Sequence, residues 1–274
     1  MSKRLRFSAL LLAVITIFSL VGCTDKEEKP QNTTEVTTAV TTKATENTET
    51  TTTAESPTTE KPKELTGRKI VVDAGHGCTE DYLEPIAPGL DPTNPEGPGT
   101  GTCGVVTNIP EKDLTLQIAL ALQKELKNKG AEVVMIRSTE GTKLSLQQRS
   151  EIGNKAKADF SIRIHADGLD SPDAEGATLL YPGSQYVGSE VSTESKIIAE
   201  TLIDSYCKET GLFNRGISER DDLTGFNFST IPVVLIELGF MTNPAEDEKM
   251  ANPNFQKKMV KGIVAGITDY YKSK

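Results

Sequence analysis

Three short apolar runs along the chain each lead to a residue that can take part in catalysis or metal binding. They occupy residues 69–74, 160–164 and 233–236, and they lead to His76, His165 and Glu237. Apolar runs of this length, bounded by glycine and polar residues, are typical of buried β-strands. In an open α/β sheet, ligands bind at the carboxyl edge of the strands. The pattern therefore predicts that the two histidines and the glutamate meet at one edge of a sheet.

Helical patterns separate these strands. Leucine or isoleucine recurs every four residues within 110–129, which predicts an amphipathic helix whose apolar stripe faces the core. Similar patterns predict helices over 145–158, 193–210 and 254–271, and further strands over 132–137 and 177–181. Strands that alternate with helices indicate an α/β fold. We expect a single domain with a mostly parallel, twisted sheet and helices on both faces.

The N-terminal part of the chain has a different composition. Basic residues up to Arg6 precede an apolar stretch from Ser8 to Val21, which is typical of a secretory signal. The segment 20–23, Leu-Val-Gly-Cys, resembles a bacterial lipobox, which implies cleavage before Cys23 and acylation of that residue. The alternative is that Cys23 is an ordinary cysteine. We expect a lipoprotein signal peptide over 1–22.

A threonine-rich segment follows this signal. It has almost no large apolar residue, so it cannot bury enough surface to fold, and we expect a disordered linker over 23–66 and one folded domain over 67–274. The net charge of −9 argues against nucleic acid as a partner, because both would be anionic. Two or more acyl chains would supply a durable membrane anchor. We therefore expect lipid anchoring at the outer face of the cytoplasmic membrane of a Gram-positive bacterium.

Two imidazoles at one sheet edge are typical of a metal site, and the chain has only two histidines. Catalytic zinc usually takes three protein ligands and leaves one position for water. Glu111 is the best third candidate because it begins the helix that follows the first strand and its loop, although the helix dipole alone also favours an acid there. Asp73 could accept a hydrogen bond from a ligand imidazole or serve only the turn. Arg163 has no assigned role.

Four segments carry a resemblance to a known family. They are Val72–Gly77, Pro110–Leu114, Ser161–Asp167 and Pro232–Asn243. In this order they resemble the motifs of the zinc-dependent N-acetylmuramoyl-L-alanine amidases of the Amidase_3 type. The resemblance implies that His76, Glu111 and His165 bind Zn²⁺ and that Glu237 is the catalytic carboxylate. It also implies that domain 67–274 cleaves the amide between N-acetylmuramic acid and L-alanine in peptidoglycan, its substrate.

The chemistry of these residue types agrees with that implication. An open zinc site lowers the pKa of bound water to about 7 and polarises a carbonyl group, as an unactivated amide requires. Glu237 could take the proton of the water and pass it to the leaving nitrogen. Alternatives are a non-catalytic cell-wall or solute-binding lipoprotein and a peptidase. The complete set of four candidates argues against a non-catalytic cell-wall lipoprotein, and the domain is small for the two lobes of a solute-binding protein. The absence of a His-Glu-x-x-His signature argues against a peptidase.

The segment between His76 and Glu111 is rich in proline and glycine, which predicts neither helix nor sheet. Since both its ends adjoin candidate ligands, we expect it to lie beside the metal, where it lines or covers the substrate groove. Asn214, Arg215 and the loop 221–227 are further groove candidates. The sequence does not identify a protein partner.

Three cysteines follow Cys23 along the chain. Cys78 and Cys103 lie near opposite ends of the proline-rich segment, and secreted proteins meet an oxidising environment, so we expect these two to form a disulfide. Cys207, within a predicted helix, would then be a free thiol. The alternative is that all three are reduced.

Overall fold

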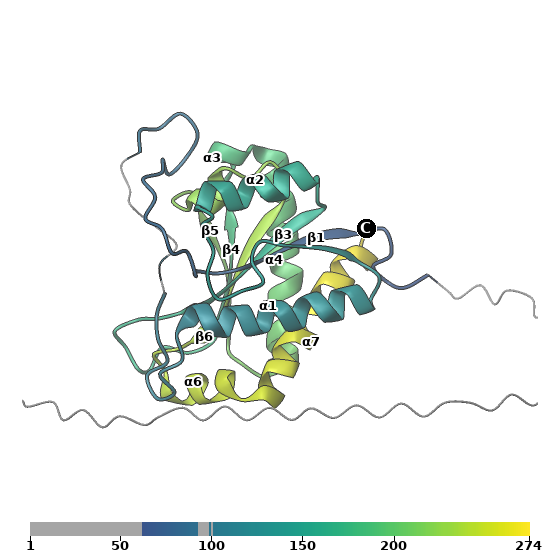
Figure 1. Ribbon diagram of the computed structural model, residues 1–274. Helices are drawn as coiled ribbons and strands as arrows, with labels where there is room; N and C mark the ends of the chain where they lie inside the picture. The colour runs from purple at the N-terminus through teal and green to yellow at the C-terminus, as the bar shows by residue number, and fades with distance from the viewer. Residues whose placement is uncertain (1–61, 93–98, 100) are drawn as a thin grey trace, which may run out of the picture. The chain divides into compact units, whose positions relative to one another are not determined.

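The computed structural model of the protein describes residues 62–92, 99 and 101–274 (Figure 1). The predicted signal peptide, Cys23 and most of the predicted linker lie outside these residues. The last linker residues, however, belong to the folded domain. Leu65 is fully buried in the core, and its amide donates to the Lys129 carbonyl at 2.9 Å. The folded domain therefore begins before the predicted boundary at residue 67.

Strands of the described residues form one six-stranded sheet. They are β1 (Lys69–Ala74), β2 (Glu132–Met135), β3 (Phe160–Asp167), β4 (Ala177–Pro182), β5 (Asn214–Arg220) and β6 (Val233–Phe240). Their order across the sheet is β2-β1-β3-β6-β4-β5. Neighbours pair in parallel except β4 and β6, which are antiparallel. The prediction of a mostly parallel sheet is thus confirmed.

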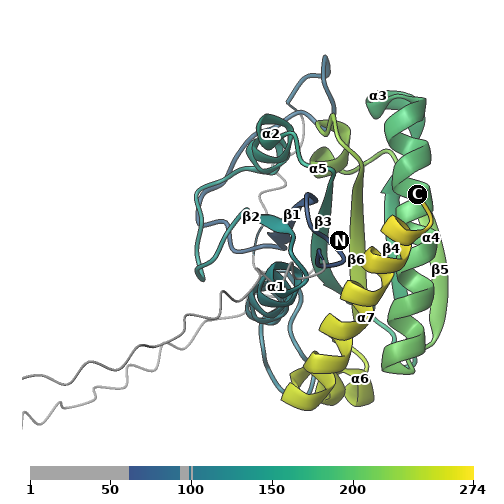
Figure 2. The same ribbon diagram turned by 90° about the vertical axis from the view of Figure 1, so that its right-hand side faces the viewer.

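Helices cover both faces of this sheet. They are α1 (Glu111–Asn128), α2 (Leu146–Ala156), α3 (Ser184–Val187), α4 (Ser189–Thr210), α5 (Thr224–Asn227), α6 (Pro244–Ala251) and α7 (Pro253–Lys272). The helices α1, α4 and α7 contribute to the largest apolar cluster on one face, whereas α2 packs beside a smaller cluster around Val71. Figure 2 shows α2 and α5 on one side of the sheet and α4 and α7 on the other. Among the described residues, no helix has the length and apolar character needed to cross a membrane.

Local signals explain where the helices that frame the site begin. The helix α1 starts after Pro110, carries acids in its first turn, and buries the predicted stripe of Leu114, Ile118, Leu122 and Leu126. The helix α2 starts with a capping box, in which Ser145 and Gln148 each bond the backbone of the other. Four elements, α3, β5, α5 and α6, were not predicted from the sequence.

The three strands that carry candidate residues lie side by side in the sheet. The central position of β1, β3 and β6 explains their apolar sequences, because strands covered by helices on both faces must bury nearly every side chain. Since these three strands are parallel, their carboxyl ends share one edge. At that edge, His165 is the register partner of Glu237.

Candidate metal centre

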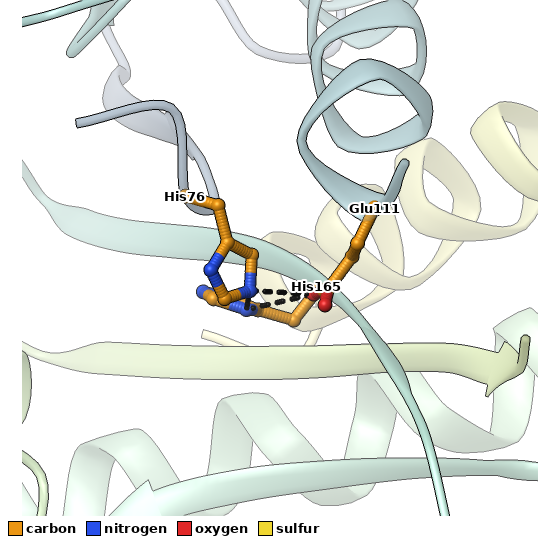
Figure 3. Close-up of side chains that lie close together, drawn as sticks. All are labelled: His76, Glu111 and His165. Carbon is orange, nitrogen blue, oxygen red and sulfur yellow. Dashed lines mark hydrogen bonds and ion pairs between the residues drawn. The ribbon is translucent and has the colours of Figure 1, made fainter. Parts of the chain in front are cut away.

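The side chains of His76, Glu111 and His165 converge at the carboxyl edge of the sheet, as Figure 3 shows. His76 Nε2 lies 2.8 Å from Glu111 Oε1. His165 Nδ1 lies 3.1 Å from the same oxygen and 3.1 Å from His76 Nε2. The structure therefore brings together the three residues that the sequence suggested as ligands, from three separate elements.

Tight backbone packing presents the two imidazoles to each other. His76 follows β1 in a left-handed conformation, with φ of 61°, which is uncommon for a residue with a side chain and costs about 1–3 kcal/mol when the surroundings enforce it. Gly75 packs directly on the His165 ring. A Cβ at Gly75 would lie 2.6 Å from His165 Nε2, so only glycine fits there.

Glu111 is held by backbone groups on both carboxylate oxygens. Oε1 accepts from the Ala166 amide at 3.1 Å, and Oε2 accepts from the Thr102 amide at 3.0 Å. Burial opposes ionisation of this carboxyl group, but hydrogen bonds from His165 and His76 hold the pKa of Glu111 well below its usual value. Glu111 is therefore a carboxylate at neutral pH.

For His165, burial outweighs the hydrogen bond to Glu111 and disfavours the charged form of the imidazole. Burial lowers the pKa of His165 from its ordinary value, although the hydrogen bond to Glu111 partly opposes this shift. The imidazole is therefore neutral at neutral pH, which is the form that binds metals.

This donor set fits a divalent cation. Two imidazole nitrogens and a carboxylate oxygen are donors that zinc accepts, and three donors around a tetrahedral zinc stand about 3.3 Å apart. The three distances in the structure, 2.8, 3.1 and 3.1 Å, are close to that spacing. Three atoms with lone pairs this close together need a cation or shared protons between them. The residues present thus match the chemistry of a metal centre.

Glu237 lies next to this group on β6. The pKa of Glu237 is raised well above its usual value, mainly by burial and further by the negative charges of Glu111 and Asp167. Its Oε2 atom is buried and has no hydrogen-bond partner within the described part of the chain. A buried carboxylate oxygen without a donor is suited to receive a proton.

Asp73 takes neither of the two roles considered for it, as a partner of a ligand imidazole or as a turn residue only. Its carboxylate instead forms two buried ion pairs, to Arg149 at 3.0 Å and to Arg163 at 3.1 Å. Arg163 is its register partner on the neighbouring strand, and Arg149 reaches it from α2. The guanidinium groups of Arg149 and Arg163 therefore occupy both carboxylate oxygens of Asp73.

Sequence reasoning also missed two arginines below the site. Arg149 donates to the His76 carbonyl at 2.8 Å, and Arg137 donates to the Gly75 carbonyl at 2.7 Å. A signal existed for Arg137, because it follows the apolar run of the second predicted strand, as His76, His165 and Glu237 follow theirs. Nothing local in the sequence marks Arg149, which lies within a polar helix.

The described ends of the proline-rich segment lie beside the ligand group, as predicted. Besides the Thr102 contact to Glu111, the Gly77 amide donates to the Gly99 carbonyl at 3.1 Å. Apart from isolated bridges, the described residues between β1 and α1 form neither helix nor strand. Farther along, Glu84 accepts from the first amides of α2. The segment therefore links the candidate ligand group to α2.

The predicted disulfide between Cys78 and Cys103 is not formed, because all three described cysteines are free thiols. Cys78 is held by a parallel bridge to Thr142, whereas Cys103 is held by an antiparallel bridge to Pro110. Each cysteine is thus fixed by a different backbone neighbour. Cys207 is free, as predicted, and buried in α4.

The other groove candidates have structural partners. Asn214 and Arg215 lie on the edge strand β5, where they donate to Asp204 and to the Glu175 carbonyl. Asn227 donates to the carbonyls of Ile86 and Asp221, so it fastens α5 to the proline-rich segment. These hydrogen bonds account for the three side chains without a substrate.

The fold and the site together define an α/β protein with a candidate catalytic metal centre at the carboxyl edge of its sheet. A family model described as N-acetylmuramoyl-L-alanine amidase matches residues 70–269. The chain therefore belongs to the N-acetylmuramoyl-L-alanine amidase family, Amidase_3.

Individual relatives agree with this assignment. The "Probable cell wall amidase LytH" of Staphylococcus epidermidis is 31% identical over 210 residues, which cover 76% of this chain and 60% of that relative. An N-acetylmuramoyl-L-alanine amidase from Clostridium difficile 630 is 30% identical, with a TM-score of 0.62 and coverage of 76% of this chain and 98% of that one. The catalytic domain of CwlV from Bacillus (Paenibacillus) polymyxa var. colistinus is 29% identical, with a TM-score of 0.61 and coverage of 76% and 99%.

Proposed function

We propose that this protein is a zinc-dependent amidase that hydrolyses the bond between N-acetylmuramic acid and L-alanine in peptidoglycan. One observation carries the proposal: the donor atoms of His76, Glu111 and His165 lie within 3.1 Å of one another, and the register partner of His165 is the carboxylate Glu237. Family membership supplies the substrate class.

In this proposal, His76 Nε2, Glu111 Oε1 and His165 Nδ1 hold the zinc. When bound, zinc supplies a Lewis acid that lowers the pKa of water to about 7 and polarises an amide carbonyl. Glu111 brings a negative charge to the site, because its pKa is low enough to keep it ionised. The two imidazoles bring neutral donors, so the protein ligands together leave a net positive charge at the centre.

Glu237 moves the proton. Its buried Oε2 takes a proton from the attacking water and then gives it to the nitrogen of L-alanine as the amide bond breaks. Burial supports this role because it raises the pKa of Glu237 well above its usual value, which favours proton uptake by this carboxylate. Glu237 does not belong to the ligand group of the structure, which separates proton transfer from metal binding.

The test is mass spectrometry of purified peptidoglycan after digestion. The wild-type protein should release stem peptides that begin with L-alanine, and removal of zinc by a chelator should abolish release until zinc is restored. Glu237→Gln should lower the rate by about 10²- to 10⁴-fold while one zinc stays bound. His165→Ala should lose zinc and activity together, since two remaining ligands bind zinc weakly.

Other results would contradict particular parts of the proposal. If Glu237→Gln lost its zinc, Glu237 would be a ligand and Glu111 only a helix-start acid. If the wild-type protein bound peptidoglycan and zinc without releasing peptide, the alternative of a non-catalytic wall-binding lipoprotein would hold.

We propose further that Cys23 is the acylated N-terminus of the mature protein, which would anchor it at the outer face of the cytoplasmic membrane. The support is the basic and apolar sequence before it and the lipobox-like segment 20–23. Cys23→Ala should move the protein out of the membrane fraction. If the variant stayed there as firmly as the wild type, the lipobox interpretation would be wrong.

A further inference from the structure

Arg137 joins two segments that carry candidate ligands. It follows β2 and is only 4% exposed. Its guanidinium group donates hydrogen bonds to oxygens of several segments. Its acceptors are Ala74 O at 2.9 Å, Gly75 O at 2.7 Å, Lys112 O at 2.7 Å, Thr139 O at 3.1 Å and Thr115 Oγ1 at 3.1 Å. Gly75 directly precedes His76, and Lys112 directly follows Glu111.

Filling space does not explain a guanidinium group at this position. All five acceptors are uncharged oxygens, so the buried positive charge gains no carboxylate partner from these bonds. Burying a charge in this way is unfavourable, and apolar side chains often replace buried charged groups with no loss of stability. What arginine adds is a rigid planar fork that fixes several acceptors relative to one another.

We propose that Arg137 is a positioning residue that sets the separation between His76 and Glu111. One nitrogen, Nη2, binds the carbonyls on the chain neighbours of both ligands at 2.7 Å each. The two ligand atoms themselves lie 2.8 Å apart. The inference rests on the proposed function, because it takes His76 and Glu111 to be metal ligands.

Two neighbouring residues support this arrangement. The Thr115 hydroxyl lies 3.0 Å from the Gly75 carbonyl and also accepts from Arg137. Thr115 therefore connects α1 to both the turn before His76 and the guanidinium group. The backbone at Gly77 packs against the guanidinium group of Arg137. A Cβ at Gly77 would lie 3.0 Å from Arg137 Cζ, and its φ of +79° favours glycine. The turn that bears His76 is thus shaped around Arg137.

The test measures metal binding rather than activity alone. Arg137→Lys keeps the charge but loses the planar fork, and Thr115→Val keeps the shape but loses the hydroxyl. We expect Arg137→Lys to bind zinc about 10- to 100-fold more weakly in competition with a chelator, as is typical when the support of a metal ligand is removed. Its cobalt-substituted form should show a changed visible absorption spectrum. Thr115→Val should also weaken zinc binding and change the cobalt spectrum.

Ser195→Ala is the matched control. Ser195 is a buried hydroxyl that accepts from the Val233 amide at 2.9 Å, at the end of β6 away from Glu237. This variant should lose stability and keep the zinc affinity and cobalt spectrum of the wild type. Arg137→Lys should therefore differ from Ser195→Ala in metal binding even where the two melt at similar temperatures.

The inference fails if Arg137→Lys melts lower but keeps its zinc affinity within about threefold and its cobalt spectrum, well short of the loss expected for a ligand support. In that case, wild-type zinc binding and peptide release would still uphold the proposed function. If Arg137→Lys does not fold, an unchanged affinity in Thr115→Val overturns the inference. A wild-type protein that bound no zinc would end both the proposed function and the inference.

Discussion

Neutralising Asp73 should destabilise this protein more than any surface change, because Asp73 is the carboxylate between two buried arginines. Its Oδ1 lies 3.0 Å from Arg149 and its Oδ2 lies 3.1 Å from Arg163. The three residues are 2%, 2% and 5% exposed, so water cannot replace a lost partner. In Asp73→Asn, the new amide group would direct its N–H donors at a guanidinium group that also only donates.

The expected loss follows from the cost of an uncompensated buried charge. Removing one partner of a buried pair typically costs about 3–5 kcal/mol. For a domain of this size, each kcal/mol lowers the melting temperature by about 2–4 °C, which gives a decrease of about 6–20 °C. Asp222→Asn is the control, because Asp222 is 60% exposed in its pair with Arg220, and exposed pairs contribute about 0–1 kcal/mol.

The effect should also depend on pH. Burial opposes ionisation of Asp73, but Arg149 and Arg163 hold the pKa of Asp73 below its ordinary value. A folded-state pKa below the unfolded value of about 3.9 gives stability that is fully present at neutral pH and is lost as the pH falls through the folded-state pKa. Urea unfolding at pH 7 should show the full difference between wild type and Asp73→Asn, and the difference should shrink in acid.

A loss below about 1 kcal/mol at pH 7, comparable with that of Asp222→Asn, would refute the argument, because buried pairs would then be as weak as exposed ones here. A difference that grew as the pH fell would refute the sign of the linkage.

Two further predictions concern other parts of the described chain. Asp247 accepts from the Val106 and Thr107 amides, so Asp247→Ala should leave these partly buried donors without their acceptor and cost about 1–3 kcal/mol in urea unfolding; no loss would show that water replaces it. Burial raises the pKa of Cys207 to about 11, so iodoacetamide should label exposed Cys103 first and Cys207 only after unfolding; equal labelling rates in the native protein would contradict this.

The sequence predicted the parts of the fold in which pattern and burial coincide. The runs that became β1, β3 and β6 are apolar because helices cover both of their faces, and apolar runs are what the pattern detects. The strand β5 escaped prediction because it is the polar, mostly exposed edge of the sheet. The helix α6 carries a usable signal, since Asn243 caps it and Pro244 is its first residue.

The three candidate residues at strand ends could be predicted for a related reason. The end of a buried strand fixes where the next side chain lies, so His76, His165 and Glu237 were expected at one edge from the strands alone. The partners of Asp73 could not be expected in the same way, because Arg149 reaches it from a helix on a different part of the chain. The disulfide prediction failed for the same reason. The backbone bridges from Cys78 to Thr142 and from Cys103 to Pro110 have no signal in the sequence.

This difference between ligands and their supports bears on how far the motifs determine function. The motifs supply the ligand atoms, but the distances between those atoms depend on side chains such as Arg137, which binds the neighbours of two ligands at once. A chain that kept His76, Glu111 and His165 but lost this fork would still match the family. Its ligands would no longer be held at the spacing that a cation requires, so family membership alone would overestimate its capacity to bind metal.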